Sequence, residues 1–391
     1  MTQTRGVVLA AGLLLMQLAL THESAAQNAD STAAADSLLI KELEAELGAS
    51  DAASESTSQR PGTAVRNTPN LNPNISVIGD FRASYTSDAR RTLDTELHEV
   101  ETALQAVVDP YARADVYISA AHAGDGEFTF EIEEAYLTTL SLPHRLQARA
   151  GKFRSVFGKL NRKHPHSLPF IDTPSVYVNY LGDEGLNDQG VSLSWLVPNS
   201  RFYQDITVEA TRGPGESESF SVQESNKFLY VAHLKNFWDL SENATLELGF
   251  SGAAGPNQTG ESTLLGGVDV TYKWKPLRFN TYRAVELQAE SFFSRMNVDV
   301  GDPVDTWGMF ALANAKVARR WGVVGRFDYS DLPDDPNWNE TAFSATARWE
   351  ATEFQKLELG VKSTAAAEMD RNLQVLFRAV FVIGAHGAHE Y

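Results

Sequence analysis

The sequence predicts an all-β fold, a transmembrane antiparallel β-barrel of about sixteen strands. Apolar and polar residues alternate in short runs from Ile75 to Ile383, as in strands that have one apolar and one polar face. The connections between these runs alternate between short and long, and aromatic residues recur near the ends of the runs. A soluble all-β protein shares the alternation, but the three features together favour a barrel whose apolar face meets lipid.

The 391 residues are expected to form three parts. Residues 1–26 have the features of a secretory signal, in which an apolar run too short to span a bilayer precedes the small residues Ser24-Ala25-Ala26. Residues 27–70 are a low-complexity arm, in which leucines at helical spacing predict a short helix over 37–47. That helix is either a frayed periplasmic helix or a small coiled-coil tag. Residues 71–391 are expected to form the barrel.

The alternating runs follow one another along this third part. Each is short enough for a single strand, and Pro, Gly, Asn and Asp cluster between them. The clearest runs are Ile75 to Tyr85, Val100 to Ala106, Ala112 to Ile118, Phe128 to Ile132, Leu193 to Trp195, Ile206 to Ala210, Phe228 to Leu234, Leu246 to Phe250, Val268 to Trp274, Val285 to Phe293, Met309 to Val317, Val323 to Tyr329, Phe343 to Trp349, Leu357 to Val361 and Leu373 to Ile383.

The connection from Ser155 to Gly190 is the longest and has no alternation of its own. A structureless loop of this length is uncommon in a compact domain unless it is functional. In a barrel such a loop can fold inward, so we expect it to narrow the lumen. Gly213 to Asn226, Gly255 to Ser262 and Asp331 to Glu340 are predicted as the other long loops.

Aromatic residues near the run ends are those expected of the girdles at the two membrane interfaces. They are Tyr85, Trp195, Trp238, Trp274, Trp307, Trp321 and Trp349. The last strand is expected to end at Tyr391, in phase with the apolar residues before it. A terminal aromatic of this kind is a signal for the bacterial barrel-assembly machinery, which we therefore expect as a partner.

If the apolar face meets lipid, the polar face lines the lumen. The lumen charges expected from the first strands are Asp80, Arg82, Glu99, Glu101, Arg113, Asp115, Glu131 and Glu133. Some of them are expected to pair across strands. The net charge of −18 favours cations in the pore and argues against a nucleic-acid partner, which needs a basic surface.

Basic residues gather where the long loop begins. They are Lys152, Arg154, Lys159, Arg162 and Lys163, and we expect them to form the pore constriction. Because these basic residues would face acidic walls, we expect them to produce either an electric field across the pore or a site where anions bind during passage.

His164 and His166 follow this basic group, separated by Pro165. Imidazole nitrogens suit Zn²⁺, and Asp172, Asp183 or Glu184 are candidate carboxylate ligands nearby. Pro165 fixes the spacing but is expected to direct the two rings apart. The alternative is a pair of solvated loop histidines, and no resident cofactor is otherwise expected. His386 and His389 form a similar weak pair near the C-terminus.

Several blocks of the chain resemble one bacterial family, the porin-like proteins labelled zinc-regulated TonB-dependent outer-membrane receptors. A more distant resemblance is to the phosphate-selective porins. The blocks are DPYARADVYIS (109–119), FEIEEAYLTTLSLP (130–143), ARAGKFRSVFGKLNRKHPHSLPFIDTP (148–174), EGLNDQGVSLSWLVP (184–198), LKNFWDLSENATLELGFSG (234–252) and VFVIGAHGAHEY (380–391). The resemblance implies an outer-membrane barrel of a Gram-negative bacterium. TonB-dependent receptors carry an N-terminal plug of more than about a hundred residues, whereas the arm expected here is short and of low complexity.

The sequence therefore favours a passive channel in the outer membrane for small hydrophilic solutes or ions, with a metal-related role left open. The alternative is a receptor barrel for a ligand such as a zinc complex. An enzyme is not expected, because no Ser–His pair appears on the outer faces of the predicted strands. We expect lipid of the outer membrane to surround the barrel. A homotrimer is one assembly that the sequence allows.

Overall fold

The computed structural model describes residues 73–87, 92–122, 128–198, 201–213, 217–221, 227–367 and 369–384. The expected signal (1–26), the arm (27–70) with its helix over 37–47, and the C-terminal residues His386, His389 and Tyr391 lie outside the described residues. Within the described part, no helix is long and apolar enough to cross a membrane.

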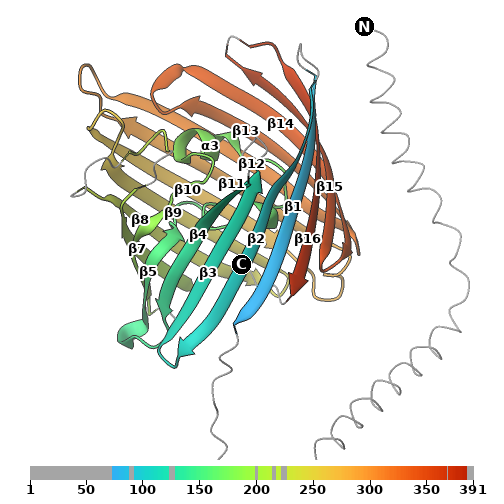
Figure 1. Ribbon diagram of the computed structural model, residues 1–391, viewed down its shortest axis with the longest axis horizontal. Helices are drawn as coiled ribbons and strands as arrows, with labels where there is room; N and C mark the ends of the chain where they lie inside the picture. The colour runs from blue at the N-terminus through green and yellow to red at the C-terminus, as the bar shows by residue number, and fades with distance from the viewer. Residues whose placement is uncertain are drawn as a thin grey trace, which may run out of the picture. The chain divides into compact units, whose positions relative to one another are not determined.

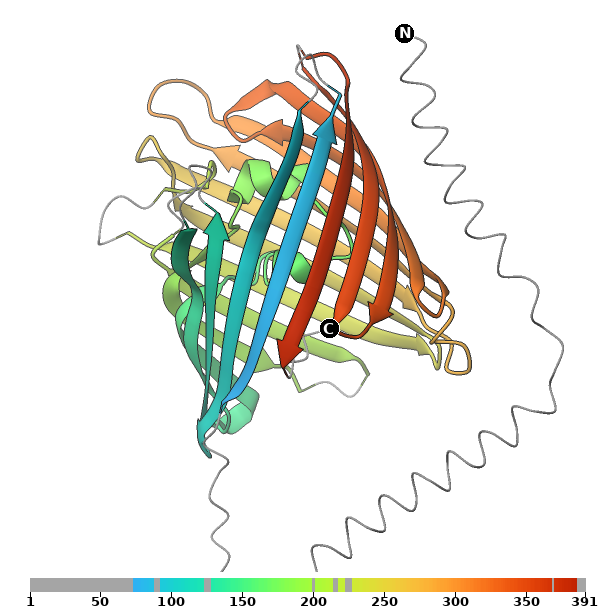
Figure 2. The same ribbon diagram turned by 45° about the vertical axis from the view of Figure 1, so that its right-hand side comes forward.

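Sixteen antiparallel strands close into a barrel, as the sequence predicts (Figure 1). Each strand pairs with its neighbours in sequence, and β1 pairs with β16 from Ser76 opposite Gly384 to Thr86 opposite Gln374. Figure 2 shows this seam, with the blue first strand beside the red last one. The strands are β1 (Asn74–Thr86), β2 (Leu93–Asp109), β3 (Ala112–His122), β4 (Phe128–Thr139), β5 (Leu146–Arg154), β6 (Asn187–Leu196), β7 (Tyr203–Thr211), β8 (Leu229–Ser241), β9 (Ala244–Pro256), β10 (Ser262–Trp274), β11 (Ala284–Met296), β12 (Val304–Ala318), β13 (Trp321–Leu332), β14 (Asp335–Thr352), β15 (Gln355–Ala366) and β16 (Asn372–Gly384).

The two faces of the wall differ as the alternation predicts. In β10, Leu264, Val268 and Val270 are exposed on the outside, whereas Asp269 and Thr271 are buried on the inside. Because successive side chains of a strand point to opposite faces, one period-two pattern gives an apolar exterior and a polar lumen. Closure also pairs the backbone groups of every strand, so no sheet edge is left to face lipid.

The two ends of the barrel differ in their connections. At one end, here called the turn end, the fully described connections are 110–111, 140–145, 242–243, 275–283, 319–320 and 353–354. At the other, the loop end, the fully described connections are 155–186, 257–261, 297–303 and 333–334. The predicted alternation of short and long connections therefore holds in general, although 275–283 is longer than expected.

One predicted loop is wrong. The segment Asp331 to Glu340 belongs almost entirely to β13 and β14, which continue to a tight turn at 333–334. Its Asp, Pro and Asn residues resemble loop composition, but Ser330 pairs with Glu340 and Asp331 with Asn339 across the ladder. The side chain of Asp335 accepts a hydrogen bond from the backbone N–H of Asn337 at 2.9 Å, which stabilises the turn.

The long loop 155–186 lies inside the barrel and includes a 3₁₀ turn, η3 (Pro165–Ser167), and the helix α3 (Ser175–Leu181). It is slightly shorter than predicted, because β6 begins at Asn187. A second short turn, η2 (Pro143–Arg145), lies at the turn end. Phe157, Leu160 and Tyr177 are almost fully buried, so the loop is packed against the wall.

Candidate functional site: the constriction loop and the lumen around it

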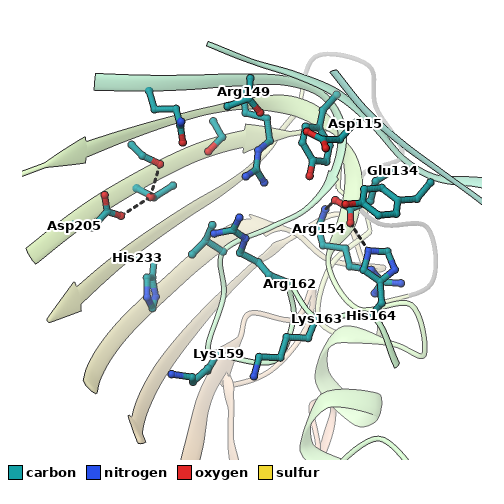
Figure 3. Close-up of a pocket in the computed structure, with 18 of the residues that line it drawn as sticks. Asp115, Glu134, Arg149, Arg154, Lys159, Arg162, Lys163, His164, Asp205 and His233 are labelled. Atoms are coloured by element: carbon teal, nitrogen blue, oxygen red, sulfur yellow. Dashed lines mark hydrogen bonds and ion pairs between the residues drawn. The ribbon is translucent and has the colours of Figure 1, made fainter. Parts of the chain in front are cut away.

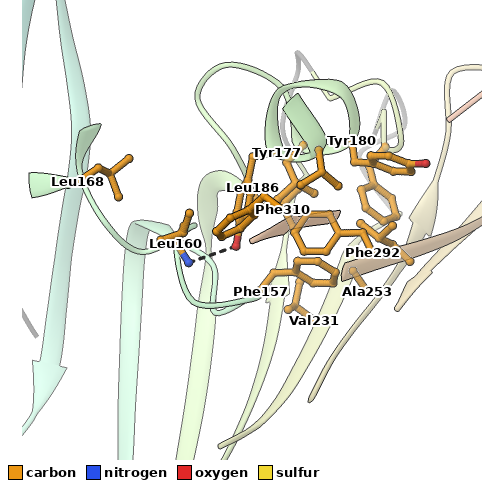
Figure 4. Packing of buried hydrophobic residues seen from close by; sticks show 14 of the residues in the cluster. Phe157, Leu160, Leu168, Tyr177, Tyr180, Leu186, Val231, Ala253, Phe292 and Phe310 are labelled. Atoms are coloured by element: carbon orange, nitrogen blue, oxygen red, sulfur yellow. Dashed lines mark hydrogen bonds between the residues drawn. The ribbon is translucent and has the colours of Figure 1, made fainter. Parts of the chain in front are cut away.

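Apolar packing holds one side of the loop 155–186 against β8 to β12 (Figure 4). The ring of Phe292 from β11 lies 5.1 Å from that of Phe157 and 4.9 Å from that of Tyr177, measured between centroids. These residues belong to one buried cluster. Its members are Phe157, Leu160, Leu168, Phe170, Val176, Tyr177, Tyr180, Leu181, Leu186, Phe220, Leu229, Val231, Ala253, Leu265, Phe292, Phe310 and Leu312. Because burying apolar side chains away from water is favourable, this cluster stabilises the folded loop against the wall.

Polar contacts extend this packing along the same side. Lys159 forms an ion pair with Glu247 of β9 at 2.6 Å, and its backbone N–H donates to Glu290 of β11 at 3.1 Å. The hydroxyl of Tyr177 also donates to Glu290. Gly158 has φ 61°, and a Cβ there would lie 2.4 Å from the Glu290 carboxylate, so the close approach requires glycine.

Charged contacts hold the opposite side of the loop against β2 and β4. His164 is buried, and its Nδ1 lies 2.7 Å from Glu101 Oε2 and 3.1 Å from Glu133 Oε2. Its Nε2 lies 2.8 Å from Glu134 Oε1. Burial alone would lower the pKa of His164, but hydrogen bonds to Glu101, Glu133 and Glu134 outweigh it and raise the pKa well above the usual value. His164 is therefore a cation surrounded by carboxylates.

Glu134 is a functional residue that the strict alternation misses. A β-bulge shifts the register of β3 and β4 between Tyr117 and Ile118, so that Glu134 follows Glu133 on the inner face instead of pointing outward. The ladder between β4 and β5 covers only Ala135 to Thr138 of β4, so Glu134 precedes its first pair. The carboxylate of Glu134 accepts a hydrogen bond from the Arg154 backbone N–H at 3.1 Å. The neighbouring acidic residues of EIEEAY were the only signal for this site in the sequence.

The same side of the loop is bound to the last strands through its backbone. Arg378 of β16 donates to the carbonyl oxygens of Pro165 at 3.0 Å and Leu168 at 2.8 Å, and it also pairs with Glu358. Lys356 of β15 donates to the carbonyl of His166 at 3.0 Å. These buried cations fix the backbone of η3.

Asp172 provides a further charged contact, to β13 and β15. Arg326 donates to its carboxylate at 2.7 Å, and Lys362 lies 2.9 Å from the same oxygen. Burial would raise the pKa of Asp172, but the charges of Arg326 and Lys362 lower it to about 2. Arg326 also lies over the ring of Phe170 at 4.6 Å, so this contact adjoins the apolar cluster.

The two histidines do not diverge as expected from Pro165. Their rings are stacked, with centroids 5.6 Å apart, because η3 turns the backbone between them. Their acidic neighbours are also different from those expected. Asp172 pairs with Arg326 and Glu184 with Arg154, whereas Glu99, Glu101 and Glu133 of the wall surround the histidines.

A cavity of about 600 Å³ lies between the loop and the turn end of the barrel (Figure 3). Arg154, Lys159, Arg162 and Lys163 of the predicted constriction line it, as do Glu101, Arg113 and Asp115 of the predicted lumen charges. Arg149 and Asp205 from the wall are further lining residues. A second cavity, of about 540 Å³, has His166 and the turn residues Arg320 and Phe354 in its lining.

The remaining predicted residues lie elsewhere. Asp80 is buried and pairs with Arg82 at 2.8 Å, and Glu99 and Glu133 lie beside the histidines. Lys152 pairs with Glu131 at 2.7 Å, and the Glu131 side chain is 61% exposed. Lys152 and Glu131 line neither of these two cavities, because they lie towards the loop end of β5 and β4 whereas the cavities lie towards the turn end.

The fold matches solved outer-membrane channels. An anion-selective porin from Comamonas acidovorans has a TM-score of 0.58 at 11% identity, over 80% of this chain and 99% of the porin. The outer-membrane channel DcaP of Acinetobacter baumannii has a TM-score of 0.56 at 11% identity, over 80% and 97%. OmpF of Salmonella typhi has a TM-score of 0.56 at 10% identity, over 80% of this chain and 97% of the OmpF chain. The chain has the fold of an outer-membrane porin, and its apolar exterior is that of a barrel whose outer face meets lipid.

An uncharacterised protein of Aquifex aeolicus (strain VF5) is 32% identical over 341 residues, which cover 75% of this chain and 70% of that protein. The chain belongs to the same family as that protein. No family model matches the chain. The narrower resemblance to zinc-regulated TonB-dependent receptors stays a prediction.

Proposed function

We propose that the barrel is a passive outer-membrane channel for small hydrophilic solutes or ions, with the loop 155–186 as its constriction and no enzymatic step. The observation that supports it is the position of Lys159, Arg162 and Lys163, which the loop carries into the lumen, where they line the cavity of about 600 Å³. The narrowest section of a pore controls both conductance and selectivity. With short turns on the periplasmic side, that cavity faces the periplasm.

The lining of this cavity does not share the acidic excess of the whole chain. Its basic members are Arg113, Arg149, Arg154, Lys159, Arg162, Lys163, Lys235 and the charged His164, and its acidic members are Glu101, Asp115, Glu134, Asp205, Glu247 and Asp269. The basic members slightly outnumber the acidic ones, so we expect weak ion selectivity rather than the cation preference that a charge of −18 suggests. Basic groups on the loop and carboxylates on the wall produce a transverse field that favours small polar solutes.

Single-channel recording in planar bilayers tests the proposal. The wild-type barrel is expected to give discrete conductance steps, and liposomes containing it to swell in small sugars. Replacing Lys159, Arg162 and Lys163 together by Gln is expected to shift the reversal potential in a KCl gradient towards cations. Arg278→Gln is the control, because Arg278 is exposed on the connection 275–283 and is outside the cavity lining.

A barrel that gives no conductance steps and no swelling contradicts the proposal and favours a receptor that binds its ligand in the cavity. Selectivity that is equal in the triple variant and the wild type contradicts the role of the loop alone.

We also propose a homotrimer as the assembly. The support is that OmpT of Vibrio cholerae, which has a TM-score of 0.53 at 9% identity over 80% of this chain and all of that chain, is described in a trimer form. Light scattering of the detergent-solubilised barrel tests this, and a monomeric mass contradicts it.

A further inference from the structure

We propose that the barrel holds a divalent transition-metal ion of the Zn²⁺ type between the constriction loop and the wall, with His166, Glu101 and Glu99 as its protein ligands. The sequence alone suggested both histidines with loop carboxylates, whereas the structure assigns one histidine and two glutamates of β2. This site does not depend on whether the barrel conducts.

The spacing of the ligand atoms supports this set. One ligand atom from each of Glu99, Glu101 and His166 lies within 4.8 Å of the others, and all three residues are buried. His166 Nδ1 is 3.7 Å from Glu101 Oε2, which is too long for a hydrogen bond. Two ligands bound to one tetrahedral Zn²⁺ at about 2.0–2.1 Å lie roughly 3.4 Å apart, which is close to the separation seen here.

His164 belongs to a second such group, with Glu101 and Glu133, but its distances favour a different role. Its Nδ1 is 2.7 Å from Glu101 Oε2 and its Nε2 is 2.8 Å from Glu134 Oε1. The Nε2 contact is a hydrogen bond and the Nδ1 contact is a close ion pair, and both are too short to leave space for an ion between the atoms. We therefore assign His164 as a positioning residue that orients the Glu101 carboxylate, as partners of metal ligands commonly do.

The charge around the site is the second, independent observation. The carboxylates of Asp80, Glu99, Glu101, Glu133 and Glu134 are all buried here. They outnumber their cationic partners Arg82, Arg154 and His164, even when His164 is counted as fully charged. The nearby cations Lys356 and Arg378 share the single carboxylate of Glu358, so the carboxylates around the site still exceed the cations by one. Oε1 of Glu99 has no hydrogen-bond partner among the described residues. Buried charge of one sign is costly unless it is paired or coordinates a metal, and a bound cation would offset this excess.

The surroundings of His166 favour binding. Lys356 donates to its carbonyl oxygen at 3.0 Å and Arg378 to that of Pro165, so the backbone that carries the ring is fixed. His166 also lines the second cavity with Arg320 and Phe354, which gives an ion and a water ligand access from the turn end. Because His166 is on the loop and both glutamates are on β2, a bound ion would link the loop to the wall.

The test is titration of the purified, EDTA-stripped full-length barrel in detergent with ZnCl₂, followed by calorimetry and by metal analysis after gel filtration. We expect one ion per chain and a higher melting temperature with Zn²⁺. His166→Ala and Glu99→Gln are each expected to weaken binding at least about 10-fold, and His164→Gln by a similar or smaller factor. His144→Ala is the matched control, since His144 lies exposed in η2 at the turn end.

Glu99→Gln keeps the shape of the side chain, and heat-modified gel mobility shows whether each variant remains a folded barrel. Loss of binding in folded His166→Ala and Glu99→Gln, with binding retained in His144→Ala, supports the site. A wild type that binds no Zn²⁺, or a folded His166→Ala that binds as tightly as the wild type, overturns it. Binding abolished by His164→Gln but unchanged in Glu99→Gln also overturns it, in favour of the His164 group. Conductance is measured separately, so failure here leaves the channel proposal standing.

Discussion

The loop 155–186 is held on its two sides by different kinds of contact. Against β8 to β12 it packs aromatic and aliphatic side chains around Phe292, whereas against β2 and β4 it places His164 among three glutamates. Apolar packing depends on buried area and is insensitive to protonation, while the ion pairs depend on the charge of each partner. The difference indicates that pH can loosen one side of the loop and leave the other side packed.

The largest effect is expected from Phe292→Ala, on the apolar side. The substitution removes a fully buried ring that contacts Phe157 and Tyr177, and it should lower the free energy of unfolding by about 3–5 kcal/mol. Urea unfolding in lipid vesicles, followed by tryptophan fluorescence, measures it. Phe293→Ala is the control, because the adjacent ring is 54% exposed on the lipid face. Equal losses for the two variants would contradict the assignment of Phe292 to the loop contact.

A smaller effect is expected from His164→Gln, on the charged side. Glutamine cannot supply a positive charge to Glu101, Glu133 and Glu134, so the variant should lose about 1.5–3 kcal/mol near pH 6 by the same unfolding assay. His144→Gln, at the exposed turn, should lose almost nothing. A loss as small in His164→Gln as in His144→Gln would show that the charged side contributes little.

The pH dependence separates the two sides further. The folded-state pKa of His164 is raised above its unfolded value of 6.5, so its stabilisation is complete below pH 6.5 and is lost as the pH rises through the folded pKa. The difference between wild type and His164→Gln should therefore shrink as the pH is raised. The Phe292→Ala difference should change less, because among the contacts described for that side only Lys159–Glu247 and Tyr177–Glu290 involve titratable groups. Asp172 does not interfere, because its pKa falls from 3.8 to about 2 and its contribution is lost only as the pH falls through that range. Unfolding measured at several pH values tests this, and parallel curves would contradict it.

The smallest effect is expected where a charge pair is exposed. Arg295 and Asp305 lie 3.8 Å apart with both side chains mostly exposed, so Asp305→Asn should change stability by less than about 1 kcal/mol, and by less still in high salt. Unfolding at two salt concentrations measures it. A loss as large as that of His164→Gln would mean that burial is not what distinguishes the two pairs.

Much of the wall could be predicted from the sequence, because each strand repeats one simple pattern. The inward Asp269 and the outward Val270 follow directly from alternation, and so does the pairing of sixteen strands. The inward position of the loop followed from its length, and the burial of Phe157 and Tyr177 from its apolar residues. These features depend on residues close together in the sequence.

The parts that could not be predicted depend on contacts between distant residues. Glu134 points inward because of a bulge opposite β3, which no local pattern reveals. The partners of His164 lie on β2 and β4, and Asp172, expected as a metal ligand, is instead bound by Arg326 from β13. The hairpin of β13 and β14 has the composition of a loop but is held by its ladder.

Arg378 has a consequence for the order of assembly. It belongs to the last strand, yet it binds the carbonyl oxygens of Pro165 and Leu168 in a loop that follows the fifth strand. These two carbonyls therefore lack this donor until the C-terminal strand has joined the sheet beside β15. The last contacts of the loop 155–186 with the wall can form only at the end of strand assembly, when β16 is in place.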